Sequence, residues 1–166
     1  HNLGWYYMKH RKMQEALEYF EKAYNIRKET YGDKDSRDIA ASLNSMGSVY
    51  VDIFKFEKGN RDEDEHNLDQ GLEYQIRSLE MRKRLFGDNK NSDFVYSYSR
   101  LGETYKQLGD NGGTTKNNKS AAYYYEEALK CYKKMLSATY ELYESCTHVY
   151  VAASLQRMAE IYEKQD

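Results

Sequence analysis

The sequence has no proline and only two cysteines and 10 glycines among its 166 residues. A chain with so few residues that break helices is typical of many helices joined by short turns. Cys131 and Cys146 are too few to build a disulfide framework. We interpret both as free thiols of a reducing compartment, which predicts a cytoplasmic location.

An excess of charge of either sign is also missing. Lys and Arg number 25 against 27 for Asp and Glu, which gives a formal net charge of −2. This balance offers no electrostatic reason to expect nucleic acid or an anionic membrane as a partner. The apolar runs are only a few residues long, whereas a membrane-spanning helix needs about 20 apolar residues. We therefore expect no nucleic-acid partner and no membrane partner.

Signals of catalysis and of cofactor or metal binding are weak. The four histidines are scattered, and none stands beside a Ser or Cys in a nucleophile motif. Gly112-Gly113 lacks the Lys-Ser/Thr that completes a phosphate-binding loop. Cys131 together with Cys146-x-His148 is a weak metal-binding pattern, because one close pair and a remote cysteine do not define a site. We expect no catalytic residues, no cofactor and no metal, and hence no enzyme.

What the chain does contain is a segment that recurs. Ile39-Ala-Ala-Ser-Leu-Asn-Ser-Met-Gly-Ser-Val-Tyr50 returns as Val151-Ala-Ala-Ser-Leu-Gln-Arg-Met-Ala-Glu-Ile-Tyr162, with both alanines, Ser, Leu, Met and the final Tyr identical. A weaker copy spans residues 94–105. Its apolar residues recur at the spacing of one helix face. A helix that recurs along a short chain indicates a repeat architecture.

The remainder of the chain repeats as well. Shifting the sequence by 55 residues aligns Ala16–Tyr50 with Gly71–Tyr105 without a gap, including the helix stops Tyr31-Gly-Asp and Phe86-Gly-Asp. Helical periodicity predicts helices over 1–10, 13–31, 39–56, 69–86, 121–143 and 147–165. The 18 tyrosines are interpreted as large packing residues of these helices.

Two polar runs interrupt the helical pattern. Residues 57–68 have a dense acidic centre, and residues 109–120 are rich in Gly and Asn. We interpret the acidic run as a solvated loop, with a cation or partner site as the less favoured alternative. The second run is predicted to be a loop as well.

Leu3-Gly4-x-x-Tyr7 followed by Ala16-x-x-x-Phe20-x-x-Ala23 resembles the tetratricopeptide repeat. Met46-Gly47 with Tyr50 and Leu101-Gly102 with Tyr105 continue the pattern. The resemblance implies an all-α, right-handed solenoid, one domain over 1–166 with three helix pairs and a final helix. The repeats are expected at about 1–32, 35–87 (insertion 57–68) and 91–143 (insertion 109–120), with the last helix at about 147–165. The Tyr/Phe-Gly-Asp stops look like the kinesin-light-chain type of repeat, although the His-Pro usual after the Gly is absent.

Proteins of this family are similar in use: they are adaptors or scaffolds, and a peptide lies in the concave groove formed by the first helix of each pair. The resemblance implies that the following residues face this groove: Trp5, Lys9, Asn44, Ser48, Asp52, Tyr96, Ser99, Glu103, Lys106, Gln156 and Glu160. Acidic residues outnumber the lysines along these helix faces, which favours a protein or peptide partner that is neutral or basic.

Two alternatives to a peptide-binding adaptor stay open. The chain begins in the middle of the pattern, so we expect a fragment, and the repeats could form a regulatory or sensor segment of a larger signalling protein. The other alternative is self-association through an exposed end helix.

Overall fold

The computed structural model describes residues 1–32, 34–57, 59–87, 91–114, 118–144 and 148–165. The chain divides into two compact units, His1–Gly87 and Asp88–Asp166. The first contains α1 (Asn2–Lys9), α2 (Met13–Tyr31), α3 (Arg37–Phe56) and α4 (Arg61–Phe86). The second contains α5 (Ser92–Asp110), β1 (Gly113–Thr114), β2 (Lys119–Ser120), α6 (Ala121–Tyr143) and α7 (Val149–Gln165). The predicted all-α class is confirmed, since β1 and β2 are only two residues each.

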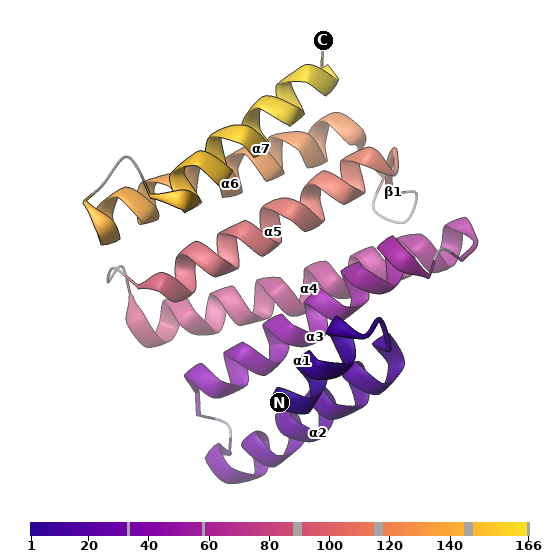
Figure 1. Cartoon of the computed structure of the whole chain (residues 1–166), viewed down its shortest axis with the longest axis vertical. Helices are drawn as coiled ribbons and strands as arrows, with labels where there is room; N and C mark the ends of the chain where they lie inside the picture. Colours follow the sequence, from indigo (N-terminus) through magenta and orange to yellow (C-terminus); the bar gives the residue numbers. More distant parts are fainter. Residues whose placement is uncertain (33, 58, 88–90, 115–117, 145–147, 166) are drawn as a thin grey trace. The chain divides into compact units, whose positions relative to one another are not determined.

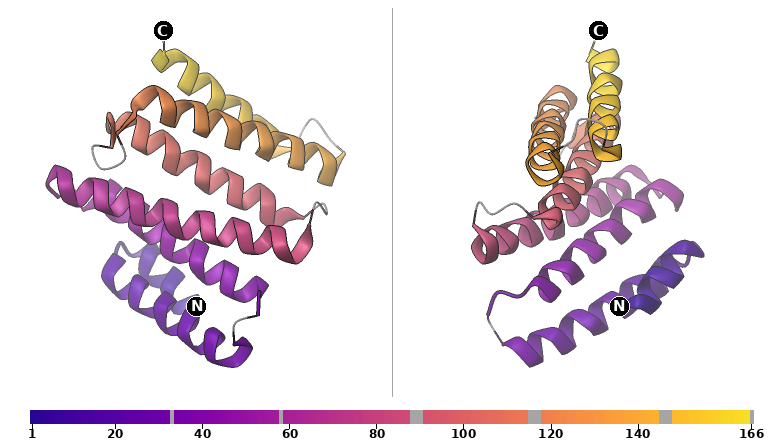
Figure 2. Two further views of the ribbon diagram at one scale, coloured as in Figure 1. Left: turned by 180° about the vertical axis from the view of Figure 1, so that it is seen from behind. Right: turned by 60° about the vertical axis from the view of Figure 1, so that its left-hand side comes forward.

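In the first unit, α1 packs on α2, α2 on α3, and α3 on α4 (Figures 1 and 2). The core lies among these helices and is formed by Met13, Ala16 and Phe20 of α2 with Ile39, Leu43, Met46 and Val49 of α3. Small residues let the helices approach closely. A Cβ atom on Gly47 of α3 would lie 2.8 Å from the carbonyl oxygen of Gly71 of α4. The recurring Gly of the motif is therefore required by helix packing.

The second unit repeats this plan, with α5 packed on α6 and α6 on α7. Its core contains Val95, Ala128, Leu129, Tyr132, Met135 and Ile161. Gly102 of α5 lies against the ring of Tyr132, where a Cβ atom would be 2.5 Å from Cε1. Each unit thus buries its own apolar core.

The tyrosines of the repeat motif stack in pairs between consecutive helices. Tyr7 stacks on Tyr19 with ring centroids 5.2 Å apart, and Tyr50 stacks on Tyr74 at 5.8 Å. In the second unit Tyr105 and Tyr124 form the same kind of pair at 6.3 Å. These tyrosines act as packing residues, as their helical spacing predicts.

The prediction of a loop over the acidic run is wrong. α4 begins at Arg61, eight residues before the predicted helix, so the acidic residues form its first turns. Asn60 and Glu63 form a capping box: the Glu63 N–H donates to Asn60 Oδ1 at 3.0 Å, and the Asn60 N–H donates to Glu63 Oε2 at 3.1 Å. Asp62, Glu63 and Asp64 lie in the first turn, where the helix dipole favours negative charge.

The loop predicted over 109–120 is also only partly correct. α5 continues to Asp110, and β1 pairs with β2 before Ser120 caps α6. Residues 115–117 lie outside the described residues. α6 is helical from Ala121 to Tyr143, as the periodicity predicts.

Candidate interaction surfaces

Trp5 of α1 covers one end of the first core. Its ring packs edge-on against Phe20 with centroids 5.5 Å apart, and its indole N–H donates to His1 Nε2 at 3.3 Å. The side chain is therefore half-buried and holds a structural contact. Lys9, in the last turn of α1, is exposed.

Asn44 and Ser48 of α3 are buried, which the groove assignment does not anticipate. Asn44 is only 1% exposed, and neither atom of its carboxamide has a hydrogen-bond partner among the described residues. The Ser48 hydroxyl donates to the Asn44 carbonyl at 3.0 Å. α3 contacts both α2 and α4, so little of its circumference is left open. Asp52, one turn further on, is half-buried.

In the second unit, side chains of α5 and α7 meet, among them the predicted groove residues Lys106 and Glu160. Arg157 Nη1 donates to Ser99 Oγ at 2.6 Å, Lys106 Nζ lies 4.0 Å from a Glu160 carboxylate oxygen, and Lys164 pairs with Asp110. We call this line of contacts the polar seam. Its members are Ser99, Glu103, Lys106 and Asp110 of α5 with Gln156, Arg157, Glu160 and Lys164 of α7. Tyr96 lies one turn before Ser99 and Arg100, and the Arg100 guanidinium sits 5.2 Å from its ring centroid.

The side chains of the polar seam are held by short-range bonds along each helix. Gln107 donates to Glu103 at 3.0 Å, and Gln156 donates to Glu160 at 3.2 Å. Glu103, Lys106 and Glu160 are half-buried, so they remain in contact with solvent. These polar groups can therefore exchange their present bonds for bonds to a ligand.

Burial alone would raise the pKa of the Asp110 carboxyl. Hydrogen bonds from Lys164, Tyr125 and Lys106 outweigh that effect and lower the pKa below its ordinary value. Asp110 is thus an ionised anchor between the end of α5, the start of α6 and the end of α7. Sequence reasoning missed it because two of its three partners, Tyr125 and Lys164, are 15 and 54 positions away.

The hydroxyl of Tyr132 was not predicted either. This α6 side chain is fully buried, its ring lies 5.6 Å from the Arg157 guanidinium, and its hydroxyl has no hydrogen-bond partner among the described residues. Burial raises its pKa, and the charges of Glu103 and Glu160 raise it further. Tyr132 therefore places a neutral hydroxyl beneath the polar seam. No pattern in the sequence indicates which of the many tyrosines has an unpaired hydroxyl.

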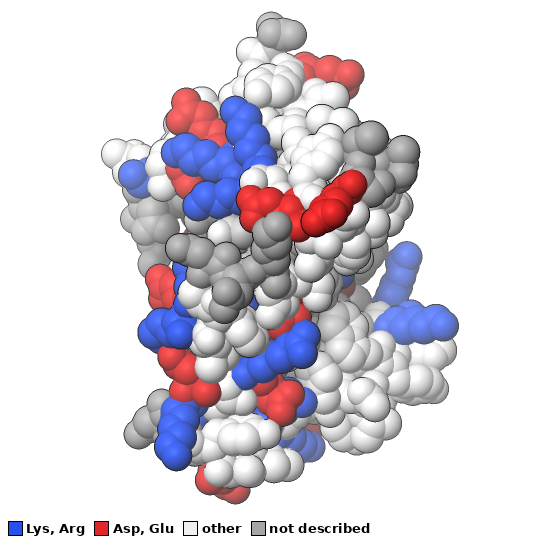
Figure 3. All heavy atoms as spheres, turned by 90° about the vertical axis from the view of Figure 1, so that its left-hand side faces the viewer, with Lys and Arg blue, Asp and Glu red and all other residues white. Residues whose placement is uncertain are grey.

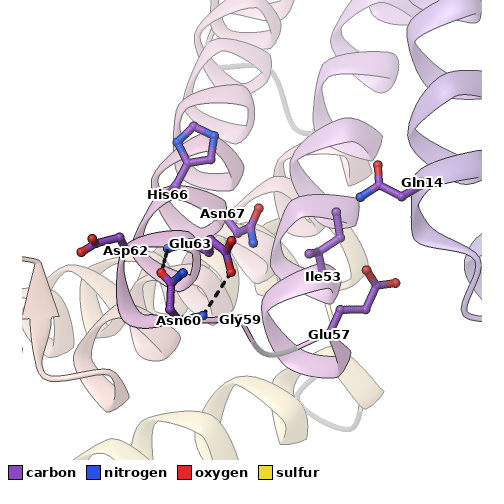
Figure 4. Close-up of a pocket in the computed structure, with 9 residues that line it drawn as sticks. All are labelled: Gln14, Ile53, Glu57, Gly59, Asn60, Asp62, Glu63, His66 and Asn67. Atoms are coloured by element: carbon purple, nitrogen blue, oxygen red, sulfur yellow. Dashed lines mark hydrogen bonds between the residues drawn. The ribbon is translucent and has the colours of Figure 1, made fainter.

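A hollow of about 480 Å³ lies in the first unit, where α3 ends and α4 begins (Figure 4). Gln14 of α2, Ile53 and Glu57 of α3, and Gly59, Asn60, Asp62, Glu63, His66 and Asn67 line it. None of these lining residues is Lys or Arg, so no cation in the lining pairs with the carboxylates of the hollow. The Glu63 carboxylate, however, already accepts a hydrogen bond in the capping box. The carboxylates are thus explained in part by helix capping.

Metal binding receives no support within the described ranges. They contain no group of three or more His, Cys, Asp or Glu side chains that could hold a metal ion. Cys131 is buried and forms no disulfide with a described residue, and His148 stacks on Tyr143 with ring centroids 3.8 Å apart. Cys146, the third member of the weak metal pattern, lies outside the described residues.

Charge on the surface is mixed. On the face drawn in Figure 3, Lys and Arg side chains are interspersed with Asp and Glu. Among the described helices, none is both long and apolar enough for a membrane crossing.

Comparison with known proteins agrees with the motif at the start of the chain. Residues 1–38 match the family model of the tetratricopeptide repeat. No curated protein matches the chain. The matched segment contains α1 and α2, whose Gly4–Phe20 and Tyr7–Tyr19 contacts join the motif residues. The chain thus carries a repeat of the tetratricopeptide type over residues 1–38.

Proposed function

We propose that this chain is a non-catalytic adaptor or scaffold module that binds a neutral or basic peptide segment of a partner protein. Tetratricopeptide repeats generally mediate interactions between proteins. The observation that carries the proposal is the polar seam, where Lys106 and Glu160, both assigned to ligand binding by the repeat register, lie 4.0 Å apart and Arg157 donates to the assigned Ser99. They are half-buried and rich in hydrogen-bonding groups, which suits recognition of a peptide backbone.

The charges of the polar seam favour a neutral or basic ligand over an acidic one. Lys106 and Lys164 both pair with Asp110, and Arg157 donates to Ser99. The two lysine charges are thus paired with a carboxylate of the chain, and the Arg157 guanidinium is hydrogen-bonded to a neutral hydroxyl. Glu103 and Glu160 each accept a hydrogen bond from a neutral glutamine, and the Lys106 ammonium, which also pairs with Asp110, lies 4.0 Å from Glu160. A Lys or Arg of the ligand would gain a charge-assisted bond there.

The Tyr132 hydroxyl offers a further contact below the seam. A buried hydroxyl without a partner costs about 1–3 kcal/mol. A ligand group that reaches this hydroxyl, directly or through a water molecule, would recover part of that cost. Asn44 presents the same chemistry on α3, where its carboxamide could serve one peptide group as both donor and acceptor.

A peptide-array screen followed by fluorescence anisotropy tests the proposal. We expect the bound peptides to be neutral or basic. Glu103→Lys and Glu160→Lys should each weaken the binding of a basic peptide by tenfold or more, because each replaces attraction by repulsion. Glu126→Lys, on the exposed surface of α6, is the matched control and should leave the affinity unchanged. Equal affinity of a peptide for all three variants would mean that the peptide does not bind at the polar seam. The effect of Asn44→Ala on that affinity would then show whether the peptide binds at α3.

The finer assignments are also proposals. The kinesin-light-chain type of repeat is supported by the paired helix stops, since Gly32 and Gly87 both have positive φ and both donate to a lysine carbonyl four residues earlier. A cytoplasmic location is supported by Cys131, which forms no disulfide with a described residue. The single domain over 1–166 and the regulatory or sensor role in a larger signalling protein stay predictions.

A further inference from the structure

The Arg157 guanidinium of α7 lies among side chains of the two neighbouring helices. Its Nη1 donates to the Ser99 hydroxyl of α5 at 2.6 Å, and its central carbon lies 5.6 Å from the ring centroid of Tyr132 of α6. The negative charges of two nearby carboxylates raise the pKa of the Tyr132 hydroxyl, and the Arg157 charge opposes this shift. A hydroxyl acceptor, an aromatic face and carboxylates are groups that bind a guanidinium. We call this set the guanidinium subsite: Ser99, Glu103, Tyr132 and Glu160.

The repeat itself does not require this arrangement. In α3 the residue equivalent to Arg157 is Ser45, whose hydroxyl donates to the Ala41 carbonyl of its own helix at 3.0 Å. In α5 the equivalent residue is Arg100, whose guanidinium lies 5.2 Å from the ring centroid of Tyr96 in the same helix. Arg157, by contrast, makes its hydrogen bond and its ring contact with two other helices. Its placement therefore needs a reason beyond the packing of the repeat.

The guanidinium subsite still contains an unused hydrogen-bonding group, the Tyr132 hydroxyl. The Tyr132 side chain is fully buried, and its hydroxyl has no hydrogen-bond partner among the described residues. A guanidinium carries five N–H donors, so one that enters slightly deeper than that of Arg157 could donate to the hydroxyls of Ser99 and Tyr132 together. The subsite thus offers an incoming arginine one hydrogen bond more than it offers Arg157.

We propose that the guanidinium subsite binds an arginine side chain of the ligand and that Arg157 occupies the subsite in the free chain. This inference rests on the proposed function, because it names the ligand group that binds at the polar seam. Arg157 then acts as a tethered competitor, which a ligand arginine has to displace. The apparent affinity for such a ligand is the intrinsic affinity multiplied by the fraction of molecules in which Arg157 lies outside the subsite.

Removal of Arg157 should therefore strengthen the binding of an arginine. An NMR titration with N-acetylarginine amide, a probe with a single guanidinium, measures this affinity. We expect Arg157→Ala to bind the probe about fivefold more tightly than the unchanged chain, or more, because the competitor is gone. The amide signal of Gly102, which lies against the Tyr132 ring, should shift on binding. N-acetylglutamine amide, which carries no positive charge, should bind the two chains equally weakly.

Arg100→Ala is the matched control, because it removes the same charge from the equivalent position of α5. It should bind the probe like the unchanged chain. Arg157→Ser is a second variant with the same expected gain as Arg157→Ala, and circular dichroism checks that each variant is folded.

Equal affinity of the unchanged chain and Arg157→Ala for the probe would overturn the proposal. An equal gain in Arg100→Ala would overturn it as well, since the loss of a positive charge would then explain the gain. A basic peptide whose binding is weakened by Glu103→Lys but unaltered by Arg157→Ala would refute the tethered arginine and leave the proposed peptide site standing.

Discussion

The twelve-residue segments Ile39–Tyr50 in α3 and Val151–Tyr162 in α7 share six identical residues but have different surroundings. Leu43 in α3 is 2% exposed, whereas the equivalent Leu155 in α7 is 50% exposed. Gly47 touches the backbone of α4, whereas the equivalent Ala159 faces solvent. The amphipathic pattern thus specifies a helix in both places, and the neighbouring helices decide which of its faces is buried.

α3 and α7 are also held by different forces. α3 lies between α2 and α4 and is fixed mainly by apolar packing. α7 packs on α6 through Ile161, and its polar flank is tied to α5 by Arg157 and Lys164. Substitutions at equivalent positions of α3 and α7 should therefore lower the free energy of unfolding by unequal amounts.

The largest difference in the free energy of unfolding is expected between substitutions of the equivalent residues Leu43 and Leu155. Leu43→Ala should lower the free energy of unfolding by about 2–5 kcal/mol, because it removes buried atoms and leaves a cavity. Leu155→Ala should cost less than about 1 kcal/mol, since half of that side chain is already in water. Urea unfolding of the two variants gives both values. Equal losses would show that α7 is as well covered as α3.

The glycine pair should give the next largest effect. Gly47→Ala should cost about 1–3 kcal/mol, because the new Cβ atom would lie 2.8 Å from the Gly71 carbonyl oxygen. This cost outweighs the helix preference of Ala. The reverse change in α7, Ala159→Gly, should cost about 1 kcal/mol from helix propensity alone. Thermal or urea unfolding distinguishes the two, and a more stable Gly47→Ala variant would contradict the close approach of α3 and α4.

The serine pair separates hydrogen bonding from burial. Ser42 and Ser154 are equivalent and both fully buried. Ser42 accepts a bond from the Arg27 guanidinium, whereas Ser154 donates to the Tyr150 carbonyl within its own helix. Ser42→Ala should cost about 1–2 kcal/mol, because a bond to a charged group is lost. Ser154→Ala should change stability by less than about 0.5 kcal/mol. Similar losses in the two unfolding curves would mean that the Arg27 bond contributes nothing.

Helices with a strong periodic pattern could be predicted from the sequence. α2 and α6 begin and end at the predicted residues, and α3 ends at the predicted Phe56. The predicted helix misses the start of α4, because a dense run of acidic residues is typical of a solvated loop. The pattern Asn60-x-x-Glu63 with acidic residues in the first turn is itself a helix-start signal, and it was available in the sequence.

The candidate interaction residues were harder to predict. Repeat register predicts that Ser99, Lys106 and Glu160 face the groove, because residues at equivalent helical positions point in equivalent directions. This assignment stays a prediction. Register does not report burial, so it did not distinguish the buried Asn44 from the half-buried Glu103. Asp110 and Tyr132 depend on partners that are distant in sequence, and no local spacing indicates them.

The smallest expected change in the free energy of unfolding is that caused by Asp110→Asn, which removes the carboxylate that Lys164 of α7 contacts. This change should depend on pH. Asp110 has a lowered pKa in the folded chain, so its bonds to Lys164, Tyr125 and Lys106 stabilise the second unit above the ordinary carboxyl pKa. This stabilisation should be lost as pH falls through the folded pKa. Asp110→Asn should therefore cost about 1 kcal/mol or less at neutral pH, because the group is partly exposed and screened. The cost should vanish in acid, where both side chains are neutral, and shrink at high salt. Urea unfolding of the two chains across pH measures the difference. A cost that is the same at every pH would mean that Asp110 acts through its shape alone, so that α7, like α3, is held by packing.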